Sequence, residues 1–235
     1  MSDKTKVKED TSPVIERFLR YKLVVQGRSP KTVEEYRIDL HTFFSYLIAT
    51  RAGLSPSDDG FYDVSISGVD NDFVKSVTTL DILEFLVYTA NERGNSTASR
   101  ARKLSALKTF FKYMVATEKV MEKNPAIDIE TPKRKASLPK YLSESESVSL
   151  LSSVLNDTES RTKERDFCII TLFLNCGMRL SELVGINLSD IDRELRSMRV
   201  VGKGNKERIV YLNDACREAL STYLNCRAKN LDTIK

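Results

Sequence analysis

Prolines interrupt a basic segment in the middle of the chain. Pro125, Pro132 and Pro139 lack the backbone N–H that a helix or a sheet ladder needs, so no regular element is expected to run through this stretch. The same stretch carries positive charge with no acid between the cations, which are Lys133, Arg134, Lys135 and Lys140. The sequence therefore predicts two folded units joined by an extended basic linker over residues 121–141. The length of 235 residues allows this, because one domain typically takes about 100–200 residues.

The first unit is predicted as a compact bundle of amphipathic helices over residues 12–120, after a flexible start at 1–11. Apolar residues recur at helical spacing in four stretches of this unit. Between the second and third stretches, residues 53–77 are rich in aspartate and glycine and show no lasting period. We expect this segment to be a long acidic loop, and the sequence indicates no role for it.

Local signals mark the four helix starts. Ser-Pro pairs at 12–13 and 29–30 are typical of an N-cap followed by the first helical residue. Thr78 with Asp81 forms a capping-box pattern, in which each side chain bonds the other residue's backbone N–H. The fourth helix is expected to start at Ser96 and to carry an apolar stripe on one face and a basic, polar face opposite it.

The second unit is predicted over residues 142–235. Ser143 with Glu146 is another capping box, and it starts a helix. Residues 167–174 are apolar nearly all round, which predicts a central buried helix that Gly177 ends.

Beyond it, the pattern predicts a short helix, then two alternating strands that form a β-hairpin around residues 202–206, and a last helix over 213–227. The chain is therefore expected to be mainly α, with a four-helix first unit and a smaller α+β second unit.

Composition excludes several classes of protein. Apolar residues at 41% and charged residues at 30% are ordinary for globular proteins. No stretch could span a bilayer and no signal peptide is evident, so a cytoplasmic location is expected. The four cysteines form no CxxC pair and are expected to be packing residues, while the single histidine, His41, makes a histidine-based metal centre or a Ser-His-Asp triad improbable. The net charge of +4 is a weak signal for nucleic acid.

Two short motifs carry candidate chemistry. Arg179 follows a helix stop, and its planar guanidinium suits two phosphate oxygens at once, with Glu182 on the same helix face to orient it. Lys203 lies in a Gly-Lys-Gly turn, with Lys206 and Arg208 nearby. The turn lacks P-loop spacing and joins two strands, so nucleotide binding is not indicated. Taken singly, each motif is more often an ordinary surface pair or a solvated hairpin tip.

Their order along the chain is more specific. The chain contains, in this order, CGMRLSELVGINLSDID, a strand, VVGKGNKERIVYL and a helix. Upstream are SPKTVEEYRIDLHTFFSYL, RKLSALKTFFKYM, NPA and LPKYLSESE. This arrangement resembles the tyrosine recombinase (phage integrase) family, and its Xer-type members most closely. The resemblance implies an N-terminal SAM-like core-binding domain and part of an α+β catalytic domain.

The resemblance also implies an activity, which is site-specific cleavage and rejoining of DNA through a 3′-phosphotyrosyl link. By match to the family motifs, Arg179 would clamp the scissile phosphate, Glu182 would support it, and Lys203 would protonate the departing 5′-oxygen. No metal and no small-molecule cofactor would be needed. The implied partners are double-stranded DNA and, in the full-length form, a recombinase tetramer on paired sites. Chromosome segregation and mobile-element integration both remain open as the biological setting.

The fourth helix, the linker and the hairpin are expected to close on duplex DNA like a clamp, because they bring cations together without matching acids. The residues predicted to contact DNA are Lys31, Thr32, Arg102, Lys103, Lys108, Lys112, Lys133, Arg134, Lys135, Lys206 and Arg208.

The family's His-x-x-Arg box, a further His or Trp, and its nucleophilic tyrosine have no counterpart in this sequence. Tyr223 comes too early in the order and is expected to be a packing residue, while His41 is in the other unit. We therefore expect a recombinase cut short, which only binds DNA by itself. A DNA-binding accessory or regulatory protein derived from a recombinase is the main alternative, and a helical protein-interaction module is a weaker one.

Overall fold

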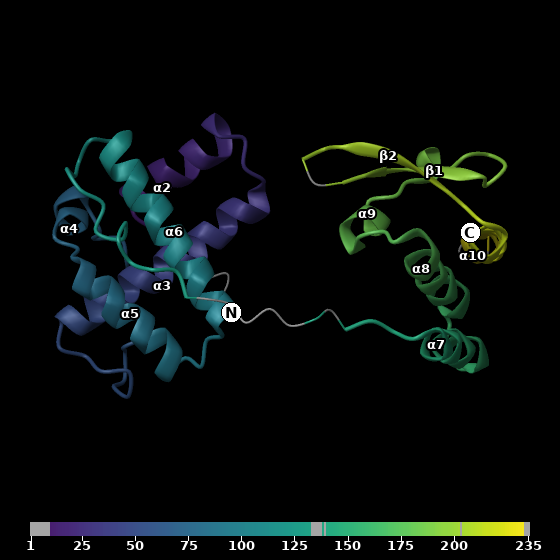
Figure 1. Cartoon of the computed structure of the whole chain (residues 1–235), viewed down its shortest axis with the longest axis horizontal. Coiled ribbons are helices and arrows are strands. Elements are labelled where there is room, and N and C mark those ends of the chain that lie inside the picture. The colour runs from purple at the N-terminus through teal and green to yellow at the C-terminus, as the bar shows by residue number, and fades with distance from the viewer. Residues whose placement is uncertain (1–9, 133–137, 139, 203, 233–235) are drawn as a thin grey trace. The chain divides into compact units, whose positions relative to one another are not determined.

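The computed structural model describes residues 10–132, 138, 140–202 and 204–232, with side chains as far as residue 228. The chain divides into two compact units, residues 1–137 and 138–235 (Figure 1). Within the described residues, no helix has both the length and the apolar character needed to cross a bilayer.

Every regular element that the structure describes in the first unit is a helix. Its helices are α2 (Pro13–Arg20), η1 (Tyr21–Val25, a π-helical segment), α3 (Pro30–Arg51), α4 (Asn71–Lys75), α5 (Thr79–Asn91) and α6 (Thr97–Ala116). The predicted starts are confirmed, since the Ser12 and Ser29 side chains accept the backbone N–H groups of Ile15 and Thr32. The capping box of Thr78 is present as well.

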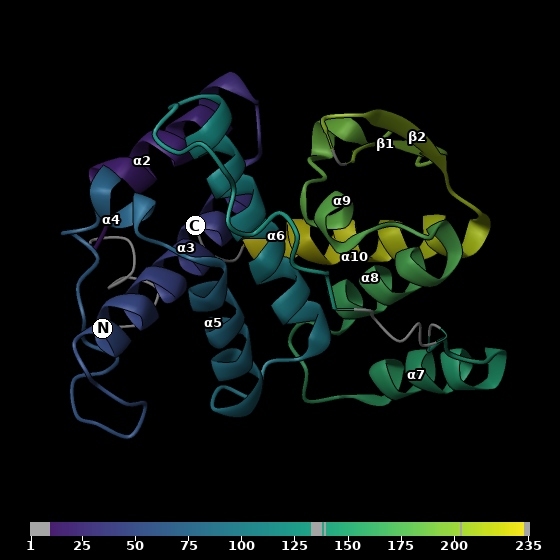
Figure 2. The same cartoon turned by 60° about the vertical axis from the view of Figure 1, so that its left-hand side comes forward.

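Aromatic side chains form the centre of this unit. Helix α3 packs against α2, α5 and α6 (Figure 2). Phe18, Phe44 and Phe110 are fully buried, and Phe110 meets the other two edge to face, with ring centroids 5.3 and 5.7 Å away. Such pairs add to the burial of apolar area, which is the main stabilising contribution. The core therefore fixes the relative positions of α2, α3 and α6.

Residues 53–77 are not a plain acidic loop. The segment contains α4 and buries Phe61, Ile66 and Val74. The carboxylate of Asp10 accepts the backbone N–H of Ile66 at 3.0 Å and the hydroxyl of Ser65 at 2.6 Å. The expectation was wrong because apolar residues in irregular backbone have no fixed period, so the pattern does not reveal which of them are buried.

Residues 121–130 also differ from the extended linker that we expected. Asn124 donates from Nδ2 to the carbonyl of Lys108 on α6, at 3.1 Å, and its Oδ1 accepts the N–H of Ala126. Ala126 and Ile129 belong to the core of the first unit. This part of the chain is therefore packed on α6.

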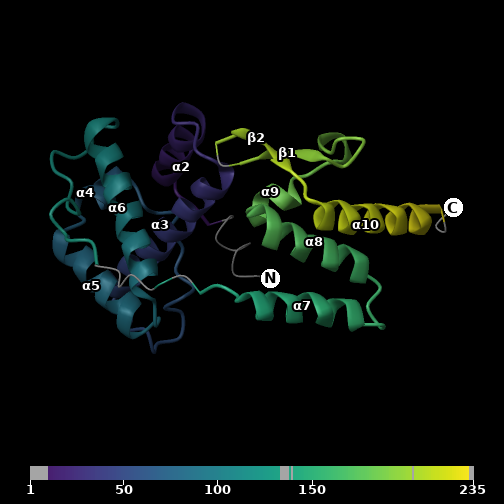
Figure 3. The same cartoon turned by 45° about the vertical axis from the view of Figure 1, so that its right-hand side comes forward.

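The second unit combines helices with one antiparallel hairpin. Its elements are α7 (Glu144–Asn156), α8 (Lys163–Cys176), α9 (Leu180–Val184), η2 (Leu188–Asp190, a 3₁₀ turn), β1 (Ser197–Val201), β2 (Glu207–Tyr211) and α10 (Asp214–Asp232). Ser197 pairs with Tyr211 and Val201 with Glu207 in the sheet. The inward side chains of the hairpin, Met198, Val200 and Val210, share a core with residues of α8 and α10. Figure 3 shows the hairpin above these two helices. The predicted fold class, mainly α with a small antiparallel hairpin, is confirmed.

Helix α8 is less buried than its composition predicted. Cys168, Thr171 and Leu172 are its buried residues, whereas Leu174 is 40% exposed. Within the described residues α8 packs against α7 and α10 and contacts the hairpin core, and most of its other side chains are partly exposed. The cysteines are free thiols, and Cys168 and Cys216 are buried as packing residues. Burial raises the pKa of the Cys168 thiol to about 11.

Candidate active site

A buried carboxylate organises the second unit's polar cluster. Glu182 lies on α9, and its side chain is only 1% exposed. Gly177 ends α8 in the left-handed region at φ 56°, which glycine adopts without the steric cost of a Cβ. The chain then turns so that Arg179 becomes the N-cap of α9, and its backbone N–H donates to Glu182 Oε2 at 2.9 Å. The local turn therefore brings Arg179 and Glu182 together, as their spacing predicted.

Arginine side chains contact this carboxylate from two elements. Arg179 Nη1 donates to Glu182 Oε1 at 2.8 Å, and Arg208 Nη2, from β2, donates to Oε2 at 3.0 Å. The backbone N–H of Arg179 and the guanidinium of Arg208 lower the pKa of Glu182 to about 2, against the opposing effect of burial. Glu182 is therefore ionised at neutral pH, and the three side chains together carry one net positive charge.

The Arg179 guanidinium combines anchorage with exposure. Its side chain is 70% exposed although one edge is bonded to Glu182. The remaining N–H groups of the planar fork can bond two oxygens of a phosphate, which a lysine ammonium cannot do in the same fixed geometry. This arrangement can hold a phosphodiester and stabilise charge that develops on it.

Gly202 allows the hairpin to approach this cluster closely. A Cβ added at Gly202 would lie 3.0 Å from Glu182 Oε1, a distance that real Cβ atoms rarely show. Lys203, the next residue and the predicted general acid, lies outside the described residues. No sequence pattern indicated the contacts of Glu182 with Gly202 and Arg208, because these contacts join residues far apart in the chain.

Arg208 and Lys206 were both predicted to contact DNA, with no acid to match their charge. Lys206 is exposed on the hairpin. Arg208 is half exposed, but its guanidinium is paired with Glu182. The expectation of an unmatched charge is therefore wrong for Arg208, because tertiary folding brings β2 against α9.

Cations on the polar face of α6 pair with acids of α3, and the sequence did not indicate these pairs. Arg102 Nη1 lies 2.7 Å from carboxylate oxygens of both Asp39 and Glu35, on α3. Lys103 is buried, and its Nζ donates to Asp39 at 3.1 Å. The expectation that these cations lack acids is wrong, because α3 crosses α6 at this point. Buried Lys103 is not placed to reach a phosphate.

The remaining predicted DNA contacts of this unit are distributed over its surface. Lys108 donates to the carbonyl of Ile127 at 3.2 Å, while Lys31, Thr32 and Lys112 are exposed. Lys133, Arg134 and Lys135 lie outside the described residues.

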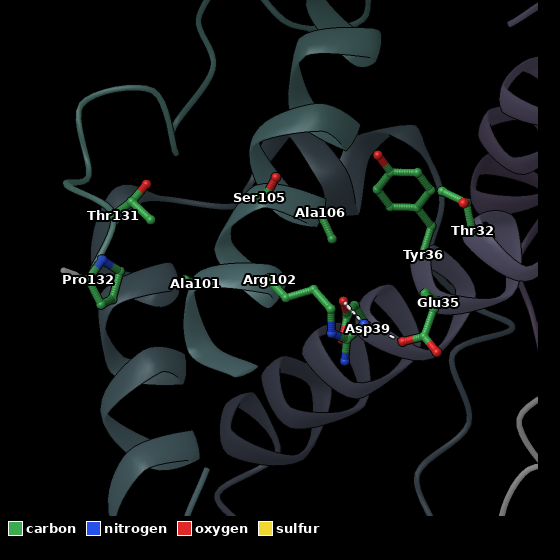
Figure 4. Close-up of a pocket in the computed structure, with 10 residues that line it drawn as sticks. All are labelled: Thr32, Glu35, Tyr36, Asp39, Ala101, Arg102, Ser105, Ala106, Thr131 and Pro132. Atoms are coloured by element: carbon green, nitrogen blue, oxygen red, sulfur yellow. Dashed lines mark hydrogen bonds and ion pairs between the residues drawn. The ribbon is translucent and has the colours of Figure 1, made fainter. Parts of the chain in front are cut away.

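A cavity of about 620 Å³ between α3 and α6 brings two of the predicted residues together. Figure 4 shows Arg102 reaching from α6 toward Asp39 and Glu35, with Thr32 and Tyr36 on the α3 side of the same cavity. Within this cavity the Arg102 guanidinium is paired with the carboxylates of Asp39 and Glu35. Among the described residues, no group of three or more His, Cys, Asp or Glu side chains is arranged to hold a metal ion.

Comparisons with known proteins give matches over most of the chain. The model of the phage integrase family matches residues 140–234. Tyrosine recombinase XerC of Caldanaerobacter subterraneus is 45% identical over 217 residues, which are 92% of this chain and 60% of the relative. XerC of Myxococcus xanthus is 36% identical over 224 residues, which are 95% of this chain and 67% of the relative. The chain thus spans roughly three fifths to two thirds of the length of these relatives.

Solved structures share the fold. A crystal structure of the XerH site-specific recombinase bound to palindromic difH substrate, a post-cleavage complex, matches with a TM-score of 0.61 and 23% identity, over 91% of this chain and 57% of that one. A lambda integrase tetramer bound to a Holliday junction matches with a TM-score of 0.58 and 19% identity, over 88% of this chain and 54% of that one. At these identities the likeness establishes the fold.

Proposed function

Because this chain belongs to the tyrosine recombinase family and is of the Xer type, we propose that it binds duplex DNA and takes part in site-specific strand cleavage and rejoining. In this reaction a tyrosine hydroxyl attacks a phosphodiester and the 5′-oxygen leaves, which forms a 3′-phosphotyrosyl link. A 5′-hydroxyl of another strand then attacks that link and releases the tyrosine. The phosphodiester energy is kept in the covalent intermediate.

The observation that carries this proposal is the exposed but anchored guanidinium of Arg179, beside the buried carboxylate of Glu182. Phosphoryl transfer places charge on the equatorial and leaving oxygens, so a fixed bidentate cation and a proton donor supply most of the catalysis. We assign the phosphate contact to Arg179 and the supporting role to Glu182. Lys203 is proposed, from its sequence position, to protonate the leaving 5′-oxygen.

The nucleophile is proposed to come from outside these 235 residues. The sequence has one histidine, His41, and no His-x-x-Arg. His41 lies on α3 of the first unit, where its Nε2 is 2.9 Å from Asp10 Oδ2. Tyr223 packs partly buried against the core of the second unit. By itself, the chain should therefore bind DNA without forming a covalent adduct.

The absence of that box from the sequence also favours a second candidate, a DNA-binding accessory protein derived from a recombinase. In either case duplex DNA is the proposed ligand. A tetramer on paired sites is proposed for a complete recombinase that contains this chain, by analogy with the lambda integrase tetramer on a Holliday junction.

The salt dependence of duplex binding tests the proposal. If about five cations contact phosphates, the logarithm of the affinity should fall with the logarithm of salt concentration with a slope of about −4 to −5. Fluorescence anisotropy with a labelled duplex between low and physiological salt measures this slope. An affinity independent of salt would contradict binding through the phosphate backbone.

A matched pair of variants locates the contact. Lys112→Ala removes an exposed lysine of α6 and should make the slope shallower by about 1. Lys75→Ala removes an exposed lysine of α4 that pairs with Asp72, and it should leave the slope unchanged. Equal slopes for both variants would remove Lys112 from the proposed interface.

A further inference from the structure

No sequence motif indicated that Arg208 pairs with Glu182 in the second unit. It lies on β2, and its Nη2 is 3.0 Å from Glu182 Oε2. The same oxygen accepts the backbone N–H of Arg179, while the other oxygen, Oε1, accepts Arg179 Nη1. One buried carboxylate therefore joins the guanidinium groups of two arginines from two different elements.

The orientation of Arg179 depends on this carboxylate. An arginine side chain that is 70% exposed has many accessible rotamers, and the bond to Glu182 Oε1 selects among them. That bond has a fixed direction only if the carboxylate itself cannot rotate. Among the described residues, the donors to its second oxygen are the Arg179 backbone and Arg208.

The hairpin meets Glu182 at a second point. Gly202 follows β1, and its missing Cβ leaves room for Glu182 Oε1. Helix α9 lies beside the end of the hairpin where β1 ends and β2 begins (Figures 1 and 2). Both strands that flank Lys203 in the sequence are thus tied to the helix that follows Arg179.

We propose that Arg208 is a positioning residue for phosphate recognition, which holds Glu182 from the hairpin and, through Glu182, aims the guanidinium of Arg179. Arg208 thereby links the strand pair that carries Lys203 to the helix that presents Arg179. The inference rests on the proposed function only for what Arg179 is aimed at. The order of the Arg179 side chain can be measured without DNA.

The test compares four variants of the 235-residue chain by NMR of the arginine side-chain N–H groups. Arg208→Ala should let the Arg179 guanidinium rotate freely, so that its separate Nη signals merge. It should also weaken binding of inorganic phosphate at Arg179 by about tenfold, because a charge-assisted hydrogen bond loses its fixed direction. Arg208→Lys keeps one charged donor and should restore most of the order.

Arg199→Ala is the matched control. Arg199 lies on β1 of the same hairpin and is also half exposed, but it pairs with Asp190 and Glu207. This variant should leave the Arg179 signals as they are in the wild type. Dispersed amide signals for residues 197–211 in each variant would show that its hairpin is folded.

Gly202→Ala gives an independent approach, because the added Cβ must displace the Glu182 carboxylate. It should disturb Arg179 as Arg208→Ala does. Separate Nη signals of Arg179 in Arg208→Ala would overturn the inference. If those signals merge but wild-type chain does not bind duplex DNA, the positioning role stands and the proposed function fails.

Discussion

Asp39 and Glu182 are buried acids, and each holds two cations. Asp39 is 2% exposed and contacts Arg102 and Lys103. Burial raises the pKa of Asp39, and the two cations oppose this effect. A buried ion pair of this kind adds little net stability, but removing one partner leaves the other charge without compensation in a region of low dielectric.

Asp39→Asn should therefore destabilise the first unit by about 3–5 kcal/mol, because buried Lys103 loses its counter-ion. Urea unfolding followed by circular dichroism measures the change. Asp72→Asn is the control, since Asp72 pairs with Lys75 in solvent and such pairs contribute about 0–1 kcal/mol. A loss below 1 kcal/mol for Asp39→Asn would show that Lys103 finds another partner or moves into water.

Glu182 predicts a pH dependence with a definite sign. Its pKa in the folded chain is about 2, against an ordinary value of 4.5. A carboxylate with a lowered pKa contributes stability above its unfolded pKa, and this contribution is lost as the pH falls through the folded pKa. Glu182→Gln should therefore melt at a lower temperature than the wild type at pH 7, and the two should converge near pH 2. A difference in melting temperature between the two proteins that stays constant from pH 7 to pH 2 would refute this role for the carboxylate.

At the scale of elements, the Asp10 side chain is one of the contacts that join the segment over residues 53–77 to α3. The Asp10 carboxylate accepts hydrogen bonds from Ser65 and Ile66, and His41 of α3 lies within 2.9 Å of it. Hydrogen bonds to a charged group contribute about 1.5–3 kcal/mol each. Asp10 therefore fixes the part of the segment that buries Ile66.

Asp10→Ala should release this segment before the helices unfold. Hydrogen exchange should show loss of protection at the Ile66 amide, while the amides of α6 keep theirs. Asp58→Ala is the control, because Asp58 is exposed and bonds only to Ser55 nearby among the described contacts. Unchanged exchange at Ile66 in Asp10→Ala would mean that the other contacts of the segment hold it without Asp10.

Whether a feature could be predicted from the sequence depends on how far apart along the chain its interacting residues lie. The helix starts at Ser12, Ser29, Thr78 and Ser143 could be predicted, because a cap and its partner lie within one turn. The hairpin could be predicted as well, since its alternation and turn are local. The packing of residues 53–77 and 121–130 could not, because it depends on distant partners and leaves no period.

The same distinction applies to the candidate site. Arg179 and Glu182 share one turn of α9, so their spacing revealed them. The pairing of Arg208 with Glu182 spans 26 positions, and that of Arg102 with Asp39 spans 63. These pairs form only when the tertiary fold brings two elements together. The cations predicted from the sequence therefore included some whose charge is already matched.

At the scale of the whole molecule, DNA binding is proposed for surfaces of both units, and the nucleophile is proposed to lie in neither. The first unit offers exposed cations such as Lys31 and Lys112, and the second offers Arg179 and Lys206. The clamp on duplex DNA remains a prediction, and the salt slope described above tests it. Cleavage requires a tyrosine that these residues are proposed to lack.

The most direct test uses one nicked duplex that traps any covalent intermediate, analysed on native and denaturing gels. The chain should shift the duplex on the native gel, because its exposed cations bind the phosphate backbone. The denaturing gel should show no adduct, since trapping needs a tyrosine placed for attack. A protease-sensitive adduct that survives denaturation would contradict the account and direct attention to Tyr211 and Tyr223, and an unshifted duplex on the native gel would contradict it equally.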